Sequence, residues 1–236
     1  MTVTLVGAGP GDPALLTGAA WDALARAEVV ALAPADAELH CVGLAPGQRA
    51  LPQAEVNALL VDLGRRHDAV VRLKSGDPFV ASRGGEEASA LREAGVAVRI
   101  VPGVSAALAA PAAAGIPLML RRLSVTLTVV DGNDDPEHGA PPDWEALARL
   151  GGTLVILTGR GRIRRIAARL IAGGLGPDTP IAAISAASRE TQQVLRGTLA
   201  ALPGPLPPPV TFVIGAVAAL DLTAPTLVTE AVGAHP

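Results

Sequence analysis

Three glycine-containing segments in the first half of the chain each follow a short apolar run that predicts a strand. They are Gly7-Ala8-Gly9-Pro10-Gly11 after Val3–Val6, Ser75-Gly76-Asp77-Pro78 after Ala69–Leu73, and Pro102-Gly103-Val104-Ser105 after Val96–Val101. Ligands of an open α/β sheet bind outside the carboxyl ends of its strands. Backbone amides in glycine-rich loops can approach an anionic or adenosine ligand. We therefore expect these loops to border one crevice.

Each loop also has a purely structural explanation. The segment Gly7–Gly11 is a poor dinucleotide fingerprint, because its third glycine comes one position early and Pro10 and Pro13 interrupt it. A tight strand-to-helix turn that needs flexible backbone angles explains it as well. Asp77 can accept hydrogen bonds from a ligand, or it can cap the next segment as an Asx-Pro turn. For each loop, both interpretations remain open at this point.

The remaining polar residues suggest little chemistry. The four histidines are scattered (His40, His67, His138 and His235), and their spacing matches neither a metal site nor a Ser/His/Asp triad. We therefore predict no metal and assign no catalytic residue. A run of arginines could form an acid-binding surface, although a solvated helix face is the more usual reason for such a run. Its members are Arg160, Arg162, Arg164, Arg165 and Arg169.

The elements that must position these residues alternate between strand-like and helix-like segments. Helices are predicted over Leu15–Ala27, Gln53–Leu63, Glu86–Glu93, Trp144–Leu150 and Ile163–Ala172. Further strands are predicted over Glu28–Leu32, Ser124–Val130, Gly152–Leu157, Ile181–Ile184, Gln193–Arg196 and Val210–Ile214. This order predicts an α/β fold, with a mostly parallel sheet in the first unit. We place one domain at residues 1–118 and a second at 123–236, with the boundary between Ile116 and Leu123.

Composition excludes several classes of protein. The chain has 236 residues and a net charge of −3, and its aromatic residues are two Phe, two Trp and no Tyr. It therefore has neither the basic charge nor the stacking side chains of a nucleic-acid-binding protein. The single cysteine, Cys41, excludes an internal disulfide and any multi-cysteine metal site. We expect no signal peptide, because the first residues lack a basic n-region and run straight into a glycine-rich turn. We expect no membrane span, because the charge-free stretch 101–120 is too short and is broken by three prolines. A cytoplasmic protein is the expectation.

Taken together, the segments resemble the tetrapyrrole (corrin/porphyrin) methylases, in particular the uroporphyrinogen-III C-methyltransferase branch. The resemblance rests on Val-Gly-Ala-Gly-Pro-Gly-Asp-Pro-x-Leu-Leu-Thr at 6–17, Val-Arg-Leu-Lys-Ser-Gly-Asp-Pro-Phe-Val at 71–80 and Arg-Gly-Gly-Glu-Glu at 83–87. Further matches lie at 51–57, 101–107, 115–118, 143–148 and 196–199. The resemblance implies two α/β domains with the active-site cleft between them, S-adenosyl-L-methionine as cofactor, S-adenosyl-L-homocysteine as product, and a homodimer.

The resemblance also assigns site residues. The family's cofactor contacts map onto Pro10, Ser75, Gly76, Asp77, Val80, Ser105, Ala106, Thr158 and Ala187. Three of these depart from the usual residue type: Ser75 and Ala187 replace glycine, and Thr158 replaces methionine. Arg83 and Arg121 are candidates to bind acidic side chains of a tetrapyrrole as bidentate donors.

Several family motifs on the substrate side are missing. The usual Tyr-Asp is Leu32-Ala33, and the usual Val-Gly-Lys is Val42-Gly43-Leu44, so an aspartate and a lysine with acid–base roles in relatives are replaced by Ala33 and Leu44. The loop between these two motifs is also shorter. The expected His-Arg is Leu120-Arg121, and the expected Thr-Gly-His is Asp131-Gly132-Asn133. Lys74, the one lysine of the chain, lies beside the best-preserved cofactor motif.

The resemblance therefore implies an S-adenosylmethionine-dependent C-methyltransferase that converts uroporphyrinogen III to precorrin-2 in sirohaem and cobalamin biosynthesis. General acid–base help contributes about 10²- to 10⁴-fold, so losing the aspartate and lysine could slow the enzyme without abolishing turnover. Two alternatives remain. One is a methyltransferase of the same fold with another acceptor, and the other is a degenerate homologue that binds the cofactor without turnover.

Overall fold

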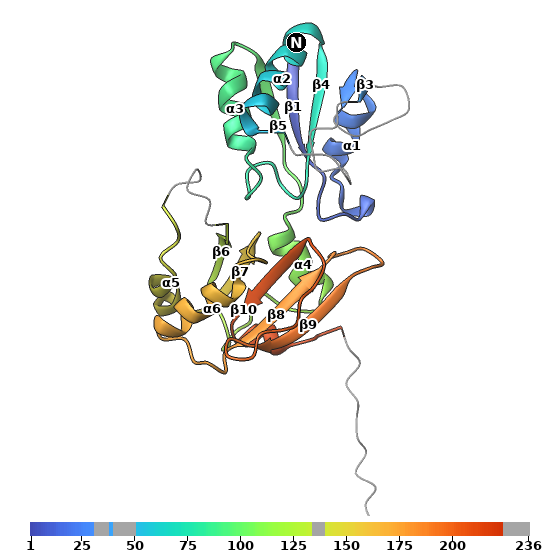
Figure 1. Ribbon diagram of the computed structural model, residues 1–236. Coiled ribbons are helices and arrows are strands. Elements are labelled where there is room, and N and C mark those ends of the chain that lie inside the picture. The colour runs from blue at the N-terminus through green and yellow to red at the C-terminus, as the bar shows by residue number, and fades with distance from the viewer. Residues whose placement is uncertain (31–37, 40–50, 134–139, 224–236) are drawn as a thin grey trace, which may run out of the picture.

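A computed structural model describes residues 1–30, 38–39, 51–133 and 140–223. It contains two five-stranded sheets, each covered by helices (Figure 1). The chain completes the first sheet before it enters the second, so the two sheets are consecutive along the sequence. In the described part of the chain, no helix combines the length and the apolar character that crossing a bilayer requires.

The first sheet is parallel throughout, as predicted for this unit. Its strand order is β3-β2-β4-β1-β5, with β1 at Thr2–Gly7, β2 at Val29–Val30, β3 at Glu38–Leu39, β4 at Ala69–Lys74 and β5 at Ala97–Val101. The helices of this domain are α1 at Gly18–Ala25, α2 at Gln53–Arg66 and α3 at Gly84–Glu93. Because β1 is flanked by β4 and β5, the loops that follow these three strands emerge next to one another.

The second sheet is mixed. Its order is β6-β7-β10-β8-β9, with β6 at Leu127–Asp131, β7 at Thr153–Leu157, β8 at Pro180–Ser185, β9 at Gln193–Thr198 and β10 at Val210–Ile214. Only β6 and β7 pair in parallel, and the other neighbours are antiparallel. Helices α5 at Trp144–Leu150 and α6 at Ile163–Ala172 lie together at one side of this sheet (Figure 1).

Helix α4, Ala106–Ala113, follows β5 and packs on the second sheet. Its Ala107 and Ala110 lie in one apolar cluster with Val155, Ala182 and Val213 of the sheet strands. The boundary predicted between Ile116 and Leu123 would assign α4 to the first domain, whereas its packing joins it to the second. The sequence did not predict this helix, because an alanine-rich segment buried on most sides shows little amphipathic periodicity.

Some predicted bounds were wrong. The helix predicted from Leu15 begins at Gly18, because the Thr17 Oγ1 accepts a hydrogen bond from the Ala20 N–H at 3.2 Å and caps the helix there. A short 3-10 turn, Pro13–Leu15, precedes it. Helix α2 runs three residues beyond the predicted end at Leu63, through Arg65 and Arg66 in its last turn. The predicted bounds of α5, α6 and β10 are confirmed.

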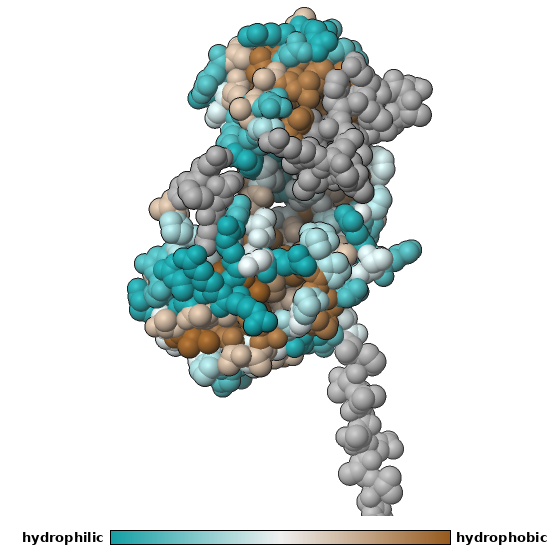
Figure 2. Space-filling model, viewed as in Figure 1, coloured by the Kyte–Doolittle hydropathy of each residue, from teal (hydrophilic) through white to brown (hydrophobic). Residues whose placement is uncertain are grey.

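The arginine run lies mainly on α6, and most of its members bind other parts of the domain. Arg169 pairs with Glu145 of α5 (Nη2–Oε2 2.7 Å), the Arg160 Nε donates to the Leu206 carbonyl at 2.8 Å, and Arg162 donates to Asn133. Figure 2 shows hydrophilic residues gathered over α5 and α6. The run is therefore largely a solvated helix face with local contacts, the more usual of the two explanations.

Candidate functional site between the two sheets

The three glycine loops meet at the carboxyl edge of the first sheet, as the sequence predicts. Gly9 and Gly76 exchange two backbone hydrogen bonds, with N···O distances of 3.2 and 2.8 Å. The Ala8 N–H also donates to the Lys74 carbonyl at 2.7 Å. These bonds continue the pairing of β1 and β4 past the ends of both strands and fix the first two loops against each other.

The third loop contacts the first two so closely that no side chain fits. A Cβ on Gly103 would lie 2.3 Å from the Gly76 carbonyl oxygen, and a Cβ on Gly7 would lie 2.5 Å from the Gly103 nitrogen. Both distances are below any that real Cβ atoms show. Glycine is therefore required at both positions for close backbone approach.

Asp77 joins the second loop to the third. Its Oδ1 accepts a hydrogen bond from the Phe79 N–H at 2.8 Å, which makes the Asx turn considered above, and its Oδ2 accepts one from the Gly103 N–H at 3.0 Å. A carboxylate that accepts two backbone N–H groups forms charge-assisted bonds, which are stronger than neutral ones. Asp77 therefore fixes the shape of the loop pair.

The structure brings most of the predicted cofactor residues together. A Cβ on Gly76 would be 3.7 Å from both the Ser105 Cα and the Ala106 nitrogen, so these segments adjoin. The Ser105 Oγ accepts the Ala107 N–H and caps α4. Val80, Ala106 and Ala187 contribute to one apolar cluster, which also contains strand residues of the second sheet.

Pro10 and Ser75 lie in the paired loops, beside Gly9 and Gly76 respectively. The loop that holds Pro10 reaches the second domain, since Gly11 lies against the guanidinium group of Arg189, two residues after Ala187. The loop that holds Pro10 thus meets the second domain close to Ala187.

A cavity of about 560 Å³ lies between the domains. The first domain contributes the loop after the Ser75-Gly76-Asp77 motif and the start of α3. The second domain contributes residues at the ends of β6 and β7. The lining residues are Pro78, Phe79, Ala81, Ser82, Arg83, Gly84, Gly85, Glu86, Asp131, Asn133 and Thr158. Two of the predicted site residues, Thr158 and Arg83, are among them.

The charged residues of the cavity have defined partners. Arg83 forms two hydrogen bonds with Glu86, Nε–Oε1 and Nη2–Oε2, both at 2.9 Å. The Asp131 Oδ1 accepts the Thr158 hydroxyl and the Asn133 N–H, the latter at 2.9 Å. The cavity thus holds a guanidinium group, which can bind carboxylates, and a half-buried carboxylate, which can accept a proton.

Arg121, the other predicted substrate residue, is exposed in the turn between Leu120 and Ser124. It is not among the residues that line this cavity. The structure therefore places Arg83 and Arg121 in different surroundings.

Three residues that line the cavity, and two that flank Ala187, have strained backbone conformations. Positive φ angles occur at Ala81 (51°), Arg83 (59°), Thr158 (56°), Ala186 (47°) and Ser188 (60°), where side chains other than glycine are disfavoured. Such strain collects at functional sites, where the surrounding structure maintains it. The strained residues that line the cavity come from both domains: Ala81 and Arg83 from the first and Thr158 from the second.

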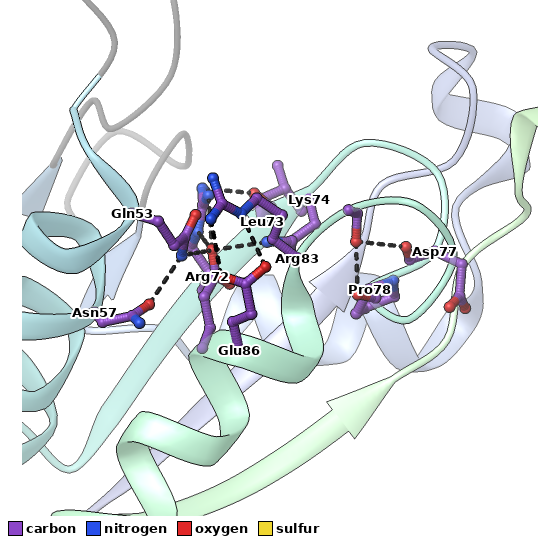
Figure 3. Close-up of polar contacts among 11 residues, drawn as sticks. Gln53, Asn57, Arg72, Leu73, Lys74, Asp77, Pro78, Arg83 and Glu86 are labelled. Carbon is purple, nitrogen blue, oxygen red and sulfur yellow. Dashed lines mark hydrogen bonds and ion pairs between the residues drawn. The ribbon is translucent and has the colours of Figure 1, made fainter. Parts of the chain in front are cut away.

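A buried ionic cluster lies within the first domain, and Figure 3 labels three of its members, Gln53, Arg72 and Lys74. The Glu87 side chain is fully buried, and its Oε1 is 2.7 Å from the Lys74 Nζ, 3.2 Å from the Arg72 Nη2 and 3.3 Å from the Gln53 Nε2. Gln53 also donates to the Asn57 Oδ1 at 2.8 Å. Burial lowers the pKa of Lys74, and the bond to Glu87 partly offsets that effect. The cluster connects α2, β4 and α3.

Nine of the eleven residues that line the cavity were not predicted from the sequence, among them Phe79, Glu86, Asp131 and Asn133. Asp131 and Asn133 were noted only as departures from a family motif, and Phe79 and Glu86 only as parts of one. The signal available for Asp131 was its place at the end of a predicted strand. Ala33 and Leu44 lie outside the described residues. Among those that are described, no group of three or more His, Cys, Asp and Glu could hold a metal ion.

Comparison with known proteins agrees with this geometry. The family model for tetrapyrrole (corrin/porphyrin) methylases matches residues 2–203. The chain is 43% identical over 210 residues to the S-adenosyl-L-methionine-dependent uroporphyrinogen III methyltransferase of Methanosarcina barkeri, covering 84% of this chain and 82% of that protein. It is 45% identical over 208 residues to siroheme synthase 1 of Klebsiella pneumoniae, covering 84% of this chain but 44% of the synthase. The chain thus spans about half the length of the siroheme synthases that it matches.

Solved structures give the same result. Uroporphyrin III C-methyl transferase from Thermus thermophilus, in its native form, superposes with a TM-score of 0.78 at 38% identity, covering 92% of this chain and 98% of that one. The same enzyme complexed with S-adenyl homocysteine superposes with a TM-score of 0.75, also at 38% identity and with the same coverage. The α/β fold, the motif order and these matches lead to one conclusion: the chain belongs to the tetrapyrrole (corrin/porphyrin) methylases.

Proposed function

We propose that this protein transfers methyl groups from S-adenosyl-L-methionine to ring carbons of uroporphyrinogen III, which yields precorrin-2 for sirohaem and cobalamin synthesis. The observation that carries the proposal is the position of the interdomain cavity. It begins at Pro78 and Phe79, directly after the Ser75-Gly76-Asp77 loop, and it contains a guanidinium group and a carboxylate. The uroporphyrinogen methyltransferases among its relatives support the choice of acceptor.

The edge of the first sheet where the three glycine loops meet is suited to bind the cofactor. Its loops approach one another without side chains at Gly7 and Gly103, and the apolar cluster of Val80, Ala106 and Ala187 adjoins them. We assign cofactor binding to Pro10, Ser75, Gly76, Asp77, Val80, Ser105, Ala106, Thr158 and Ala187. When bound, S-adenosyl-L-methionine supplies an electrophilic methyl group on a sulfonium. Among the assigned residues, Asp77 acts by holding the loop backbone.

The cavity residues act on the acceptor. Arg83, which bonds Glu86 through Nε and Nη2, is placed to exchange that carboxylate for an acetate or propionate side chain of the substrate as a bidentate donor. We assign Arg121 to the same substrate from the exposed turn. An electron-rich pyrrole carbon is already a nucleophile, so holding it in position supplies much of the rate. After the new C–C bond forms, the ring must lose a proton. The Asp131 carboxylate lies in the cavity to receive it.

Anaerobic incubation with uroporphyrinogen III and S-adenosyl-L-methionine, followed by mass spectrometry, tests the proposal. We expect products heavier by one and two methyl groups. No mass gain would overturn the acceptor assignment, and labelling of another metabolite from an extract would favour a different acceptor. Cofactor binding without any turnover would favour the degenerate homologue.

Calorimetry with S-adenosyl-L-homocysteine tests the cofactor site separately. We expect Asp77→Ala to weaken binding at least tenfold, because two charge-assisted hydrogen bonds are lost at about 1.5 kcal/mol or more each. Equal binding by the wild type and this variant would show that the cofactor site lies elsewhere.

We propose that the protein forms a homodimer and that it acts in the cytoplasm. Exposed apolar side chains gather along the segment that leads from α4 into β6, at Met119, Leu120, Leu123 and Val125. Contiguous exposed apolar surface of this kind often marks a protein interface. Light scattering after size-exclusion chromatography should give twice the chain mass of 23.7 kDa, and a monomer would contradict the assembly.

A further inference from the structure

Phe79 is an aromatic side chain that the fold leaves unburied at the proposed site. Its exposed fraction is 57%, and it lines the interdomain cavity. Trp144 and Phe212 are buried at 2% and 5% exposure and belong to the core of the second domain. Trp21 is also exposed, but it does not line the cavity, so Phe79 is distinguished by its position there. A large aromatic ring open to solvent forgoes the free energy that burial would give. An exposed ring at a cavity therefore suggests a ligand that covers it.

We propose that the Phe79 ring stacks on a pyrrole ring of the tetrapyrrole substrate and positions it in the interdomain cavity. This assignment rests on the proposed function and specifies which chain residue contacts the ring faces. Aromatic rings prefer offset or edge-to-face packing, and each pyrrole ring offers a flat, apolar face. Arg83, in the same cavity, offers a partner for the acidic side chains at the edge of such a molecule.

The loop that carries Phe79 is fixed by its own hydrogen bonds. The Phe79 N–H is held by the Asp77 carboxylate, and the Ser82 Oγ donates to the carbonyls of Asp77 and Pro78 at 2.9 and 2.6 Å. The Gly84 N–H also donates to the Pro78 carbonyl at 3.1 Å. A ring on a rigid loop loses little conformational freedom when a ligand covers it, and such preorganisation favours binding.

Asp77 also connects the loop that carries Phe79 to the third glycine loop, which we assign to the cofactor site. One of its oxygens holds Phe79, and the other holds Gly103 of the third glycine loop. The two functions can therefore be separated by mutation. Removing the Asp77 carboxylate disturbs both loops, whereas removing the Phe79 ring leaves the backbone bonds intact. Phe79 variants should affect the tetrapyrrole and spare the cofactor.

The experiment compares four variants with the wild-type protein. Phe79→Ala removes the ring, Phe79→Leu keeps apolar volume without a ring, and Phe79→Trp keeps a ring. Trp21→Ala is the matched control, because Trp21 is 53% exposed on α1 and is not among the residues that line the cavity. The readouts are KM and kcat for uroporphyrinogen III under anaerobic conditions, Kd for oxidised uroporphyrin III from its absorption shift, and Kd for S-adenosyl-L-homocysteine.

We expect Phe79→Ala and Phe79→Leu to raise KM and the uroporphyrin Kd about tenfold. Phe79→Trp and Trp21→Ala should stay within twofold of the wild type, as should the S-adenosyl-L-homocysteine Kd in every variant. A Phe79→Leu protein that binds uroporphyrin as tightly as the wild type would overturn the stacking role. So would parallel losses for both ligands in Phe79→Ala, which would show a disturbed loop.

The outcomes separate this inference from the proposed function. Turnover by the wild type with unchanged constants in Phe79→Ala would reject the stacking role and leave the function standing. Ring-dependent uroporphyrin binding without turnover would keep the stacking role and reject the function. A wild-type protein that neither binds uroporphyrin nor methylates uroporphyrinogen would reject both.

Discussion

The Lys74 Nζ lies 2.7 Å from the Glu87 Oε1, and both side chains are almost completely withdrawn from solvent. Lys74 ends β4 immediately before the Ser75-Gly76-Asp77 loop, and Glu87 lies in the first turn of α3, close to the cavity residues Arg83 and Glu86. Among the described residues, the other oxygen, the Glu87 Oε2, has no hydrogen-bond partner. This pair therefore connects the strand that precedes the Ser75-Gly76-Asp77 loop to the helix that begins at the cavity.

Replacing Glu87 by Gln should lower the free energy of unfolding by about 3–5 kcal/mol, because Lys74 and Arg72 are left without a buried counter-charge. Urea unfolding measures this loss. Lys74→Met combined with Glu87→Gln should cost less than the sum of the two single changes. Additive effects would show that the pair is not coupled.

Gly103→Ala should abolish S-adenosyl-L-homocysteine binding, because the added Cβ would lie 2.3 Å from the Gly76 carbonyl oxygen and force the glycine loops apart. Calorimetry measures the binding. The control is Gly18→Ala at the start of α1, where a Cβ meets nothing within 4 Å. That variant should bind normally, and normal binding by Gly103→Ala would contradict the close approach of the loops.

Asp131→Asn should reduce kcat by about 10²- to 10⁴-fold, the usual contribution of a general base. The amide keeps an oxygen for the Thr158 and Asn133 bonds but cannot take up a proton, so the fold and the cofactor Kd should not change. Single-turnover rates with uroporphyrinogen III measure the effect. A kcat within threefold of the wild type would show that Asp131 is not the base and that water takes up the proton instead.

Arg83→Ala should raise KM for uroporphyrinogen III about tenfold, since charged hydrogen bonds contribute about 1.5–3 kcal/mol each. The cofactor Kd should be unaffected. Arg121→Ala tests the second assigned arginine in the same assay, and Arg164→Ala on α6 is a control outside this cavity. If Arg83→Ala and Arg164→Ala give the same KM, Arg83 does not bind the substrate.

The Arg169–Glu145 pair predicts an acid-dependent loss of stability. The bond to Arg169 lowers the pKa of Glu145 to about 2 from 4.5. A lowered carboxyl pKa stabilises the fold above the unfolded-state value, and this contribution disappears as the pH falls from 4.5 toward 2. Arg169→Gln should therefore have a lower Tm than the wild type at pH 7, and the difference should shrink by pH 2.5. A difference that stays constant with pH would exclude the ionic contribution.

The sequence predicted the elements whose residues show strong periodicity. The arginine-flanked apolar face of Ile163–Ala172 and the apolar run Val210–Ile214 have the bounds predicted for them. The grouping of the three glycine loops also followed from parallel strand order. Two features needed the tertiary structure. α4 has no amphipathic face to detect, and Asp131 reaches the cavity only because the second sheet faces the first across the gap.

The segment Pro102–Ser105 has a mechanical consequence. It leads from β5 of the first sheet to α4, which packs on the second, so through it the chain passes from one domain to the other. Any rotation of one domain against the other must change the backbone angles of this segment. Its Gly103 is bonded to the Asp77 carboxylate, and its Ser105 caps α4. The joint between the domains is thus itself part of the edge where the three glycine loops meet, and a ligand bound at that edge would stiffen the joint.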